Sequence, residues 1–530
     1  MSEDSLVRAS SVMAVGTIFS RVTGLIRGLL VVALLGSAIL GDTFNVANTM
    51  PNILFNLLVG GALTSVFMPQ IVRSLRDSDG GDGFISRLFT ISIILLLIIS
   101  ILGIIFSPNL VNLYAPEYAG RREFEVTVQL MRYCLPQIFF LGLYALLGQI
   151  ANSKSIFGPM MWAPVLNNLV SIFLFMWLII NRGNLNLNSI SDSDLMIIGL
   201  GTTFAYSLQA FILVPVVLRS GVGLKFVLDW KDKQLFKSLR LAVWGFIYAA
   251  ISQLSYLVTV NLATSSAVKA LDNGVTAGVG FTPYANAYLI LLVPHSIISV
   301  SVVTAMLPRL SNFVIDKKFD SFSELITKSI KLVGVFTVPT SVFFLLFGTE
   351  ITQAIFFGIG TADAEYLGFV LSAFAFGLIP VSINLVLLRG FNAFEDMKSQ
   401  VLVNLIMNFI SVLFSYIAVA TLKPQWVTVG LAGIFTIHYF IGIFISLFLI
   451  RKHRIFLQIF NLFTFHLKLI VISMITILPL WLLKANFPSW NIFILSFVIV
   501  ITVIFYLGIS KLLKITEVTS LLKVIRPGRQ

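Results

Sequence analysis

The sequence predicts an all-α polytopic membrane protein with about fourteen transmembrane helices. Hydrophobic residues make up 58% of the 530-residue chain and charged residues only 11%, whereas soluble domains carry about 25% charged residues. Apolar stretches of bilayer-spanning length follow one another along almost the whole chain. Lysine and arginine are also far more abundant in alternate loops. These observations exclude a soluble protein, so the net charge of +13 does not indicate nucleic-acid binding.

The apolar stretches, taken in order, define the expected spans. Turn-forming and charged residues separate them, as in DSDGGDG (77–83), NSKSIFGP (152–159) and RKHR (451–454). The expected spans cover residues 9–36, 43–72, 86–107, 124–150, 159–181, 195–218, 237–264, 282–307, 329–348, 366–390, 401–420, 428–450, 466–483 and 490–510.

The distribution of basic residues gives this map an orientation. With the N-terminus in the cytoplasm, 27 of the 36 Lys and Arg residues fall in cytoplasmic segments. Two more, Arg21 and Arg27, lie inside the first span. Only seven fall on the opposite side: Arg121, Arg122, Arg132, Arg182, Lys269, Lys423 and Lys484. This asymmetry predicts that both termini are cytoplasmic.

The two arginines of the first span are the most unusual feature of the sequence. A charged side chain at the bilayer centre costs roughly 2.5–3.5 kcal/mol. The six-residue separation places Arg21 and Arg27 about 9 Å apart along a helix and roughly 120° apart around it, so they cannot both reach the same water surface. One alternative is that they anchor the helix at an interface. We favour the other alternative, in which at least one faces protein or a water-filled cavity.

An internal repeat predicts how the spans are grouped. The second and eighth spans both end in small apolar residues, then Met-Pro or Leu-Pro, then a cytoplasmic arginine. The fourth and tenth spans both end in an Asn-bearing, charged loop. A shift of six spans relates each pair, which predicts two six-helix lobes and two further C-terminal helices. The expected domains are an N-lobe (1–218), a cytoplasmic amphipathic linker (219–236), a C-lobe (237–455), and a groove-forming helix pair with a cytoplasmic tail (456–530).

Several runs of the sequence resemble the motifs of one family, the MurJ/MviN lipid II flippases. These runs are SRVTGLIR (20–27), GDTF (41–44), MPNIL (50–54), GGALTSVFMP (60–69), NSKSIFGPMMWAPVLNN (152–168) and LRGFNAFEDMKSQ (388–400). The resemblance covers essentially the whole chain. It implies the fold of the MATE-like exporter superfamily, which also contains multidrug, oligosaccharidyl-lipid and polysaccharide exporters.

The resemblance also implies a function and a location. A family member is expected to flip lipid II, the undecaprenyl-pyrophosphate-linked peptidoglycan precursor, from the cytoplasmic to the outer leaflet of a bacterial plasma membrane by alternating access. The implied partners are lipid II, membrane lipids, and the cell-wall synthesis and division machinery. Arg21, Arg27 and Asp42 match positions that the family uses in its central cavity, and the last two spans match its groove for the polyprenyl tail.

The chain departs from the family pattern at several of these positions. Phe55 and Asn56 stand where many members carry two arginines, Gly60 replaces a common acidic residue, and Gly28 stands where Asp often follows the second arginine. The eighth span, which brings another arginine into the cavity in many members, offers Asn286 instead. These departures predict that Arg21 and Arg27 make most of the charged contacts with the pyrophosphate.

Asparagines complete the expected binding site. Asn45, Asn48, Asn52 and Asn56 share one helical stripe, and they either line the chamber or bond a neighbouring helix. The expected substrate-binding residues are Arg21, Arg27, Asp42, Asn48, Asn52, Asn56 and Asn286. Asn261, Asn404 and Asn408 resemble a region where some relatives hold sodium, but no membrane carboxylate lies near them in the sequence, so we favour structural hydrogen bonding. We likewise favour packing over proton relay for His295.

Two other classes of membrane protein remain as alternatives. One is another transporter of the same superfold, either an exopolysaccharide-lipid flippase or a multidrug exporter, although a cation exporter should show membrane carboxylates. The other is a membrane glycosyltransferase or polymerase, which would need catalytic carboxylates in sizeable outer loops. The outer loops are short, and we find no P-loop, metal cluster or nucleophile triad. We therefore expect a transporter rather than an enzyme, with no cofactor.

Overall fold

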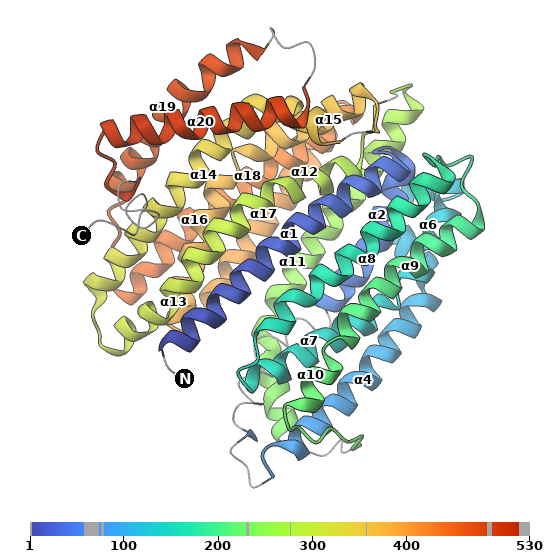
Figure 1. The fold of residues 1–530 in the computed structure, drawn as a ribbon, viewed down its shortest axis with the longest axis horizontal. Coiled ribbons are helices and arrows are strands. Elements are labelled where there is room, and N and C mark those ends of the chain that lie inside the picture. Colours follow the sequence, from blue (N-terminus) through green and yellow to red (C-terminus); the bar gives the residue numbers. More distant parts are fainter. Residues whose placement is uncertain are drawn as a thin grey trace. The chain divides into compact units, whose positions relative to one another are not determined.

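The computed structural model describes residues 3–57, 71, 74–75, 79–228, 233–275, 277–356, 358–484 and 490–518. Within these ranges the chain forms helices joined by turns and short irregular segments, without a strand. Contacts divide the chain into two compact units. The first comprises Met1–Thr276 with Gly280–Thr282, and the second comprises Ala277–Val279 with Pro283–Gln530. Each unit is a helix bundle (Figure 1).

The first unit contains the helices that precede residue 280. In chain order they are α1 (Glu3–Leu35), α2 (Ile39–Phe55), α4 (Asp82–Ile105), α5 (Ser107–Tyr114), η3 (Pro116–Tyr118), α6 (Arg122–Cys134), α7 (Gln137–Ser153), α8 (Gly158–Arg182), α9 (Asp192–Phe211), α10 (Val214–Arg219) and α11 (Lys233–Asp272). Its main pairings join α1 to α8, α2 to α6, and α8 to α9. Glycine permits some of these close approaches, because a Cβ at Gly201 of α9 would overlap Leu174 of α8.

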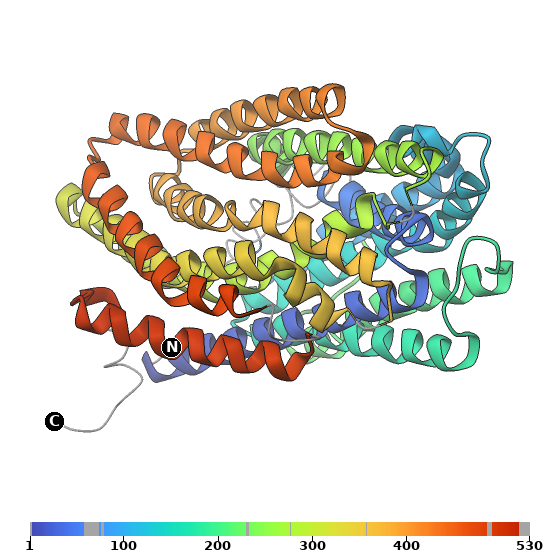
Figure 2. The same cartoon turned by 90° about the horizontal axis from the view of Figure 1, so that it is seen from above.

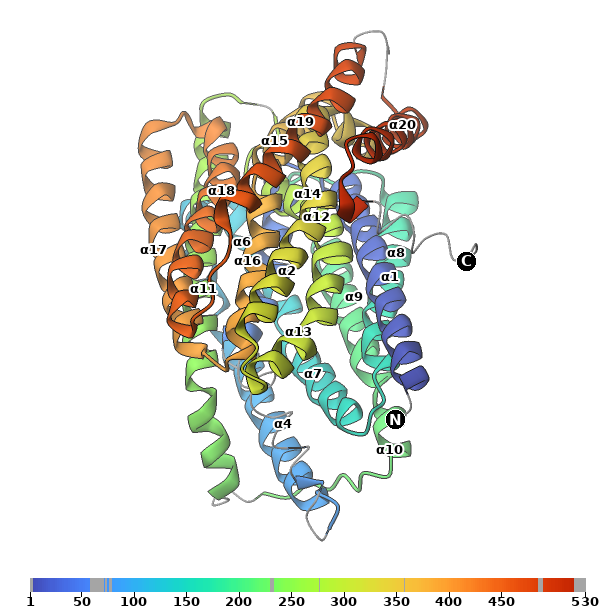
Figure 3. The same cartoon turned by 90° about the vertical axis from the view of Figure 1, so that its left-hand side faces the viewer.

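The second unit contains the remaining helices. They are α12 (Phe281–Pro294), the π turn η4 (His295–Ser299), α13 (Val300–Ile315), α14 (Phe319–Ile355), α15 (Thr361–Ala375), α16 (Leu378–Ala393), α17 (Met397–Thr421), α18 (Pro424–Leu449), η5 (Ile450–His453), α19 (Ile459–Leu482) and α20 (Ile492–Leu512). The long helix α14 packs on α15, α16 and α19. The last two helices, α19 and α20, pack on α14 and on each other (Figures 2 and 3).

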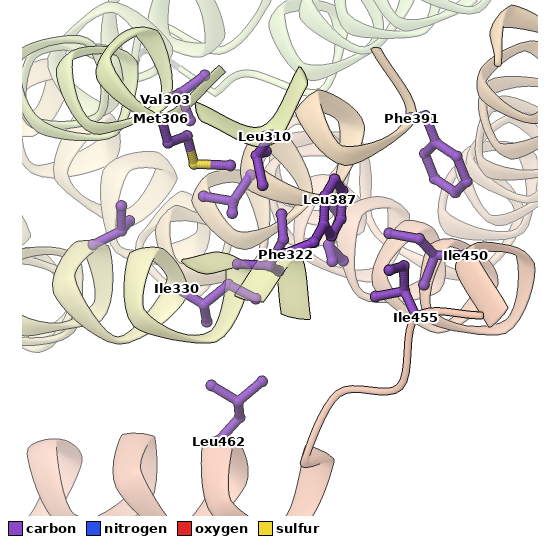
Figure 4. Packing of buried hydrophobic residues seen from close by; sticks show 13 residues of the cluster. Val303, Met306, Leu310, Phe322, Ile330, Leu387, Phe391, Ile450, Ile455 and Leu462 are labelled. Carbon is purple, nitrogen blue, oxygen red and sulfur yellow. The ribbon is translucent and has the colours of Figure 1, made fainter. Parts of the chain in front are cut away.

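A buried apolar cluster joins α13, α14 and α16 in the second unit. Its members come from these helices, from the η5 turn, from the segment that leads into α19 and from α19 itself (Figure 4). The side chains labelled in the figure are Val303, Met306, Leu310, Phe322, Ile330, Leu387, Phe391, Ile450, Ile455 and Leu462. Apolar side chains from these segments thus pack into one buried core.

The predicted fold class is confirmed. Among the described residues, twelve helices are long and apolar enough to cross a membrane, or thirteen if the bent pair α15 and α16 forms one span. Part of the expected second span, 43–72, lies outside the described residues, and its described helix α2 ends at Phe55. The contacts place α11 in the first unit, whereas the sequence grouped residues 237–264 with the later spans. The division into lobes stays a prediction.

The expected linker, 219–236, is not helical where it is described beyond α10. Residues 222–228 have no regular secondary structure and run along the start of α4. The backbone N–H groups of Lys225 and Val227 donate to the hydroxyls of Ser86 and Thr90 at 3.1 and 2.9 Å. Side chains of α4 therefore satisfy backbone groups that an amphipathic helix would have satisfied internally.

Several expected spans contain breaks that the hydropathy pattern did not predict. The fourth span divides into α6 and α7 at Leu135-Pro136, because proline lacks the N–H that would continue the helical ladder. The tenth divides into α15 and α16, bent by 44°. The eighth contains the π turn at 295–299, and a π turn also begins at residues 56–57 of the second. These four breaks fall in the two pairs of spans that the internal repeat relates, and the sixth expected span also divides, into α9 and α10.

The motif at 388–400 forms a junction at one end of the second unit. The Asp396 carboxylate accepts from the backbone N–H of Ser399, which caps α17, and pairs with Lys452 and His453 of η5. Partial burial raises the pKa of Asp396, but the hydrogen bonds from Lys452, His453 and Ser399 outweigh it, so the pKa lies well below its usual value. A single carboxylate thus joins the start of α17 to the turn after α18.

We expect cysteines at Asn188 and Thr361 to be labelled only from outside, and a cysteine at Lys318 only from the cytoplasm. The native thiol, Cys134, is buried, so each variant is made in a Cys134→Ser background. The three positions are exposed and follow the fifth, ninth and eighth expected spans. The measurement is labelling by a membrane-impermeant maleimide in intact cells and in inverted vesicles, with Cys134→Ser alone as the unlabelled control. Labelling of Asn188→Cys and Lys318→Cys from the same side would contradict the fourteen-span map.

Candidate functional site

Arg21 and Arg27 lie on the half of α1 that the protein leaves accessible. Arg21 is exposed and Arg27 is half-buried, whereas α1 is buried from Leu30 to Leu35. Within the described part of the chain neither guanidinium makes a hydrogen bond or an ion pair. A cation without a carboxylate partner on a membrane helix retains its full capacity to bind an anion.

The neighbouring helix α8 fixes how α1 is rotated. The Asn168 side chain donates to the backbone carbonyl of Ser20 at 2.9 Å and to the Thr23 hydroxyl at 3.0 Å. One turn before Thr23 on α1, the Phe19 ring stacks on Trp162 of α8, with ring centroids 5.6 Å apart. Phe19 and Thr23, whose side chains contact α8, lie two residues before and after Arg21 and therefore on the opposite side of the helix. The Arg21 side chain thus points away from α8.

Asp42 occupies a buried position at the start of α2. Its carboxylate is 0% exposed and accepts hydrogen bonds from the backbone N–H groups of Phe281 and Thr282, at 2.9 and 2.6 Å. These are the first two residues of α12, where a helix has unsatisfied donors and a positive dipole end. Gly280 has a φ of +141°, and a Cβ there would overlap the carboxylate. The observed role of Asp42 is therefore that of a cap for α12.

The asparagine stripe of α2 separates into two parts. The Asn45 amide donates to the Thr282 hydroxyl at 2.9 Å, and the Gln137 amide of α7 donates to Asn48 at 3.4 Å. These contacts are the interhelical alternative for this stripe. Asn52 is half-buried and Asn56 is exposed, and neither side chain bonds to another residue in the described ranges. Asn52 and Asn56 are thus the members of the stripe that a polar ligand can still engage.

The candidates of the second unit are buried. Asn286 is 7% exposed, and the His295 Nδ1 lies 2.9 Å from the Ser382 hydroxyl, which is a packing arrangement. The Asn408 amide donates to the Asn404 side chain at 2.7 Å.

The three asparagines of the weakly predicted sodium site belong to different units. Asn404 and Asn408 belong to the second unit, whereas Asn261 belongs to the first, where its amide donates to the Leu113 carbonyl at 3.1 Å. Within the described residues no group of three or more His, Cys, Asp or Glu side chains could hold a metal ion. The sodium site stays a prediction.

Comparison with known proteins decides the family. The family model described as lipid II flippase MurJ matches residues 31–501, which is most of the chain. The chain belongs to the MurJ lipid II flippase family. A probable lipid II flippase MurJ from Rickettsia prowazekii is 26% identical over 524 residues, which cover 97% of this chain and 99% of that protein. The lipid II flippase MurJ from Burkholderia cenocepacia is 24% identical over 434 residues, covering 81% of each.

Solved structures agree on the fold. A lipid II flippase MurJ in an inward closed conformation matches with a TM-score of 0.75 and 22% identity, over 97% of this chain and 99% of that one. An inward-facing multidrug resistance MATE family transporter matches with a TM-score of 0.65 and 16% identity, over 82% and 95%. Both the predicted MurJ/MviN resemblance and the MATE-like architecture are confirmed.

Two residues of this MurJ-family protein position α1 although the sequence alone did not indicate that role. Asn168 and Trp162 fall inside a quoted motif, 152–168, but only the structure shows that they hold α1. A polar residue in the middle of an apolar span was the available signal, because a buried amide in a membrane helix needs a partner. The partner itself lies 145 residues away in the sequence and could not be named.

We expect Asp42→Ala to lower the free energy of unfolding by about 2–3 kcal/mol, because it leaves two buried backbone N–H groups without an acceptor. Asp42→Asn should lose less, since one acceptor oxygen remains. The measurement is thermal unfolding of the purified protein in detergent. The matched control is Asp192→Ala, an exposed carboxylate in the first turn of α9. Equal melting temperatures for Asp42→Ala and Asp192→Ala would show that the cap does not stabilise the fold.

Proposed function

We propose that this protein flips lipid II from the cytoplasmic to the outer leaflet of the bacterial plasma membrane by alternating access. Membership of the MurJ family supports the substrate. The observation that carries the proposal is the pair Arg21 and Arg27, two cations without carboxylate partners among the described residues on the accessible half of α1. Guanidinium groups offer a fork of donors that suits pyrophosphate, which is the linking group of this substrate.

The remaining parts of the substrate need different surroundings. The sugar and peptide need polar partners, which Asn52 and Asn56 offer on α2. The polyprenyl tail needs an apolar surface, which the exposed faces of α19 and α20 offer: Phe463 is 64% exposed and Phe497 61%. These faces meet lipid directly, so a tail can lie on them at no desolvation cost. Asp42 and Asn48, which contact other helices, contribute to the site through the positions of α2 and α12.

Alternating access needs helices that bend at defined places. The break between α15 and α16 and the π turn after α12 are such places, because interruptions of the i to i−4 ladder concentrate bending. We propose that these breaks take up the change between cytoplasm-facing and outward-facing states.

The membrane potential is the proposed source of energy. Moving two negative charges outward across an inside-negative potential of 100 mV is favourable by roughly 4.6 kcal/mol, at about 2.3 kcal/mol per charge. If Arg21 and Arg27 neutralise the pyrophosphate, the loaded step moves little net charge, and the empty return carries the two cations inward. The same potential favours that return. In either case a full cycle moves negative charge outward and needs no ATP.

We expect Arg27→Ala to abolish complementation of cells depleted of their lipid II flippase, and Arg21→Ala to abolish or nearly abolish it. Lysine at either position should retain more activity than alanine, because it keeps the charge and loses only the fork. The measurement is growth at matched, low membrane levels of each variant. The control is Arg219→Ala, an exposed arginine at the end of α10. Growth of both alanine variants at control levels would rule out the arginine site. Failure of the wild-type chain in these cells, with full membrane levels, would instead favour an exopolysaccharide-lipid flippase, a multidrug exporter or a membrane polymerase.

We expect collapse of the membrane potential, at constant ATP and constant pH gradient, to stall outward movement of lipid II in cells that rely on this protein. The protein should then accumulate facing outward, because the return of the bare arginines loses its driving force. The measurements are the accessibility of lipid II at the outer surface and side-specific cysteine labelling. An unchanged rate would point to ion coupling, with Asn404 and Asn408 as the first residues to test.

A further inference from the structure

A cavity of about 590 Å³ lies in the second unit where the start of α19 meets α14 and the end of α20. Its walls combine lysines with apolar side chains. We call it the basic cavity, and its lining includes Lys331, Lys468 and Lys514 as cations, Glu517 as the one acidic residue, and Phe465 and Ile472 at its apolar base. All three lysines belong to segments that the charge distribution places at the cytoplasmic side.

The lining changes character along α19. Asn461, Thr464 and Lys468 are spaced by three and four residues and therefore share a helical face. The same face continues into the membrane span with Val471 and Ile475. The wall is thus polar over the first turns of α19 and apolar beyond Lys468. A lipid needs this order, with polar partners for its head group followed by an apolar surface for its chains.

The charges around the cavity favour an anion. Lys331 is only partly exposed and sits over the Phe465 ring, with its Nζ 5.1 Å from the centroid. Glu517 lies 3.9 Å from the Lys331 Nζ and offsets part of this charge. Three lysines against one carboxylate leave an excess of two positive charges. Lys468 and Lys514 are exposed at the mouth, where they can reach a phosphate without losing their hydration beforehand.

The end of α20 closes the cavity through an unusual backbone. Lys514 has a φ of +52°, and the Ile515 N–H returns to the Ser510 carbonyl at 3.0 Å, which ends the helix and turns the chain back. Ile515 and Val518 then pack into the cluster formed by α14, α19 and α20. The Tyr506 hydroxyl donates to the Val335 carbonyl at 2.8 Å and fixes α20 against α14. The walls are therefore held by packing on both sides.

We propose that the basic cavity binds the phosphate head group of an anionic phospholipid of the cytoplasmic leaflet, with its acyl chains along Val471 and Ile475. Lysine suits this ligand because a phosphodiester carries one diffuse charge that a point cation can approach from several directions. This site is separate from Arg21 and Arg27, which lie in the other unit. The proposal therefore does not depend on what the protein transports.

The test uses the full-length protein, purified in a neutral detergent and delipidated, with bound lipid counted by mass spectrometry of the intact complex. The probes are phosphatidylglycerol, phosphatidylcholine, a polyprenyl pyrophosphate and inorganic phosphate. We expect wild-type protein to retain phosphatidylglycerol in preference to phosphatidylcholine, and inorganic phosphate at equal concentration not to displace it. Retention should fall by about fivefold for Lys468→Gln and by at least about tenfold for Lys331→Gln, Lys468→Gln and Lys514→Gln combined.

Three further variants separate charge from folding. Lys318→Gln removes an exposed lysine of the same unit outside the cavity and should leave retention unchanged. Replacing the three cavity lysines by arginine should preserve retention, and Glu517→Gln should increase it, which keeps the proposal testable if the triple glutamine variant fails to fold. Equal retention by Lys318→Gln and the triple glutamine variant would overturn the proposal. So would equal retention of the two phospholipids, displacement by inorganic phosphate, or retention of the polyprenyl pyrophosphate alone.

Discussion

The buried carboxylate of Asp42 is the constraint that fixes the start of α12 against α2. It joins the start of α2 to the first turn of α12, at the point where the chain leaves the first unit and enters the second. In an apolar interior, a helix start has unsatisfied donors that cost several kcal/mol unless an acceptor is supplied. A carboxylate supplies acceptors and also complements the positive end of the helix dipole. Substitution at this position thus affects the ends of two helices that the internal repeat relates.

Much of the fold could be predicted from the sequence, because a bilayer imposes length and hydropathy on every spanning helix. The expected first span and the α1 helix agree for this reason, and so do the expected span at 401–420 and α17. The breaks could not be predicted from the same signal. A window average treats 124–150 as one apolar segment, although Pro136 divides it, and nothing in the hydropathy of 282–307 marks the π turn.

The sequence could identify the charged residues of the candidate site but not the contacts of its polar residues. A charge inside a span is conspicuous, so Arg21 and Arg27 could be selected from the sequence. The roles of Asp42, Asn48 and Asn168 depend on partners more than 85 residues away, at Phe281, Gln137 and Thr23. Residues of the same type on one stripe also separate in role, since Asn48 bonds to α7 and Asn56 is exposed. Only tertiary contacts distinguish a polar residue that packs helices from one that meets a ligand.

The π turn at His295–Ser299 has a consequence for how this protein has been able to change. A turn that closes with i to i+5 bonds accommodates one residue more than an α turn, so everything after it is rotated by about 100° relative to an uninterrupted helix. Val303, Met306 and Leu310, which follow the turn on α13, belong to the buried cluster (Figure 4). Loss of one residue from this turn would let it close as an α turn with the apolar face of α13 still on its core, whereas loss of a residue within α13 would rotate that face by about 100°. The turn is therefore the point in this helical segment where the number of residues can change with the least effect on packing.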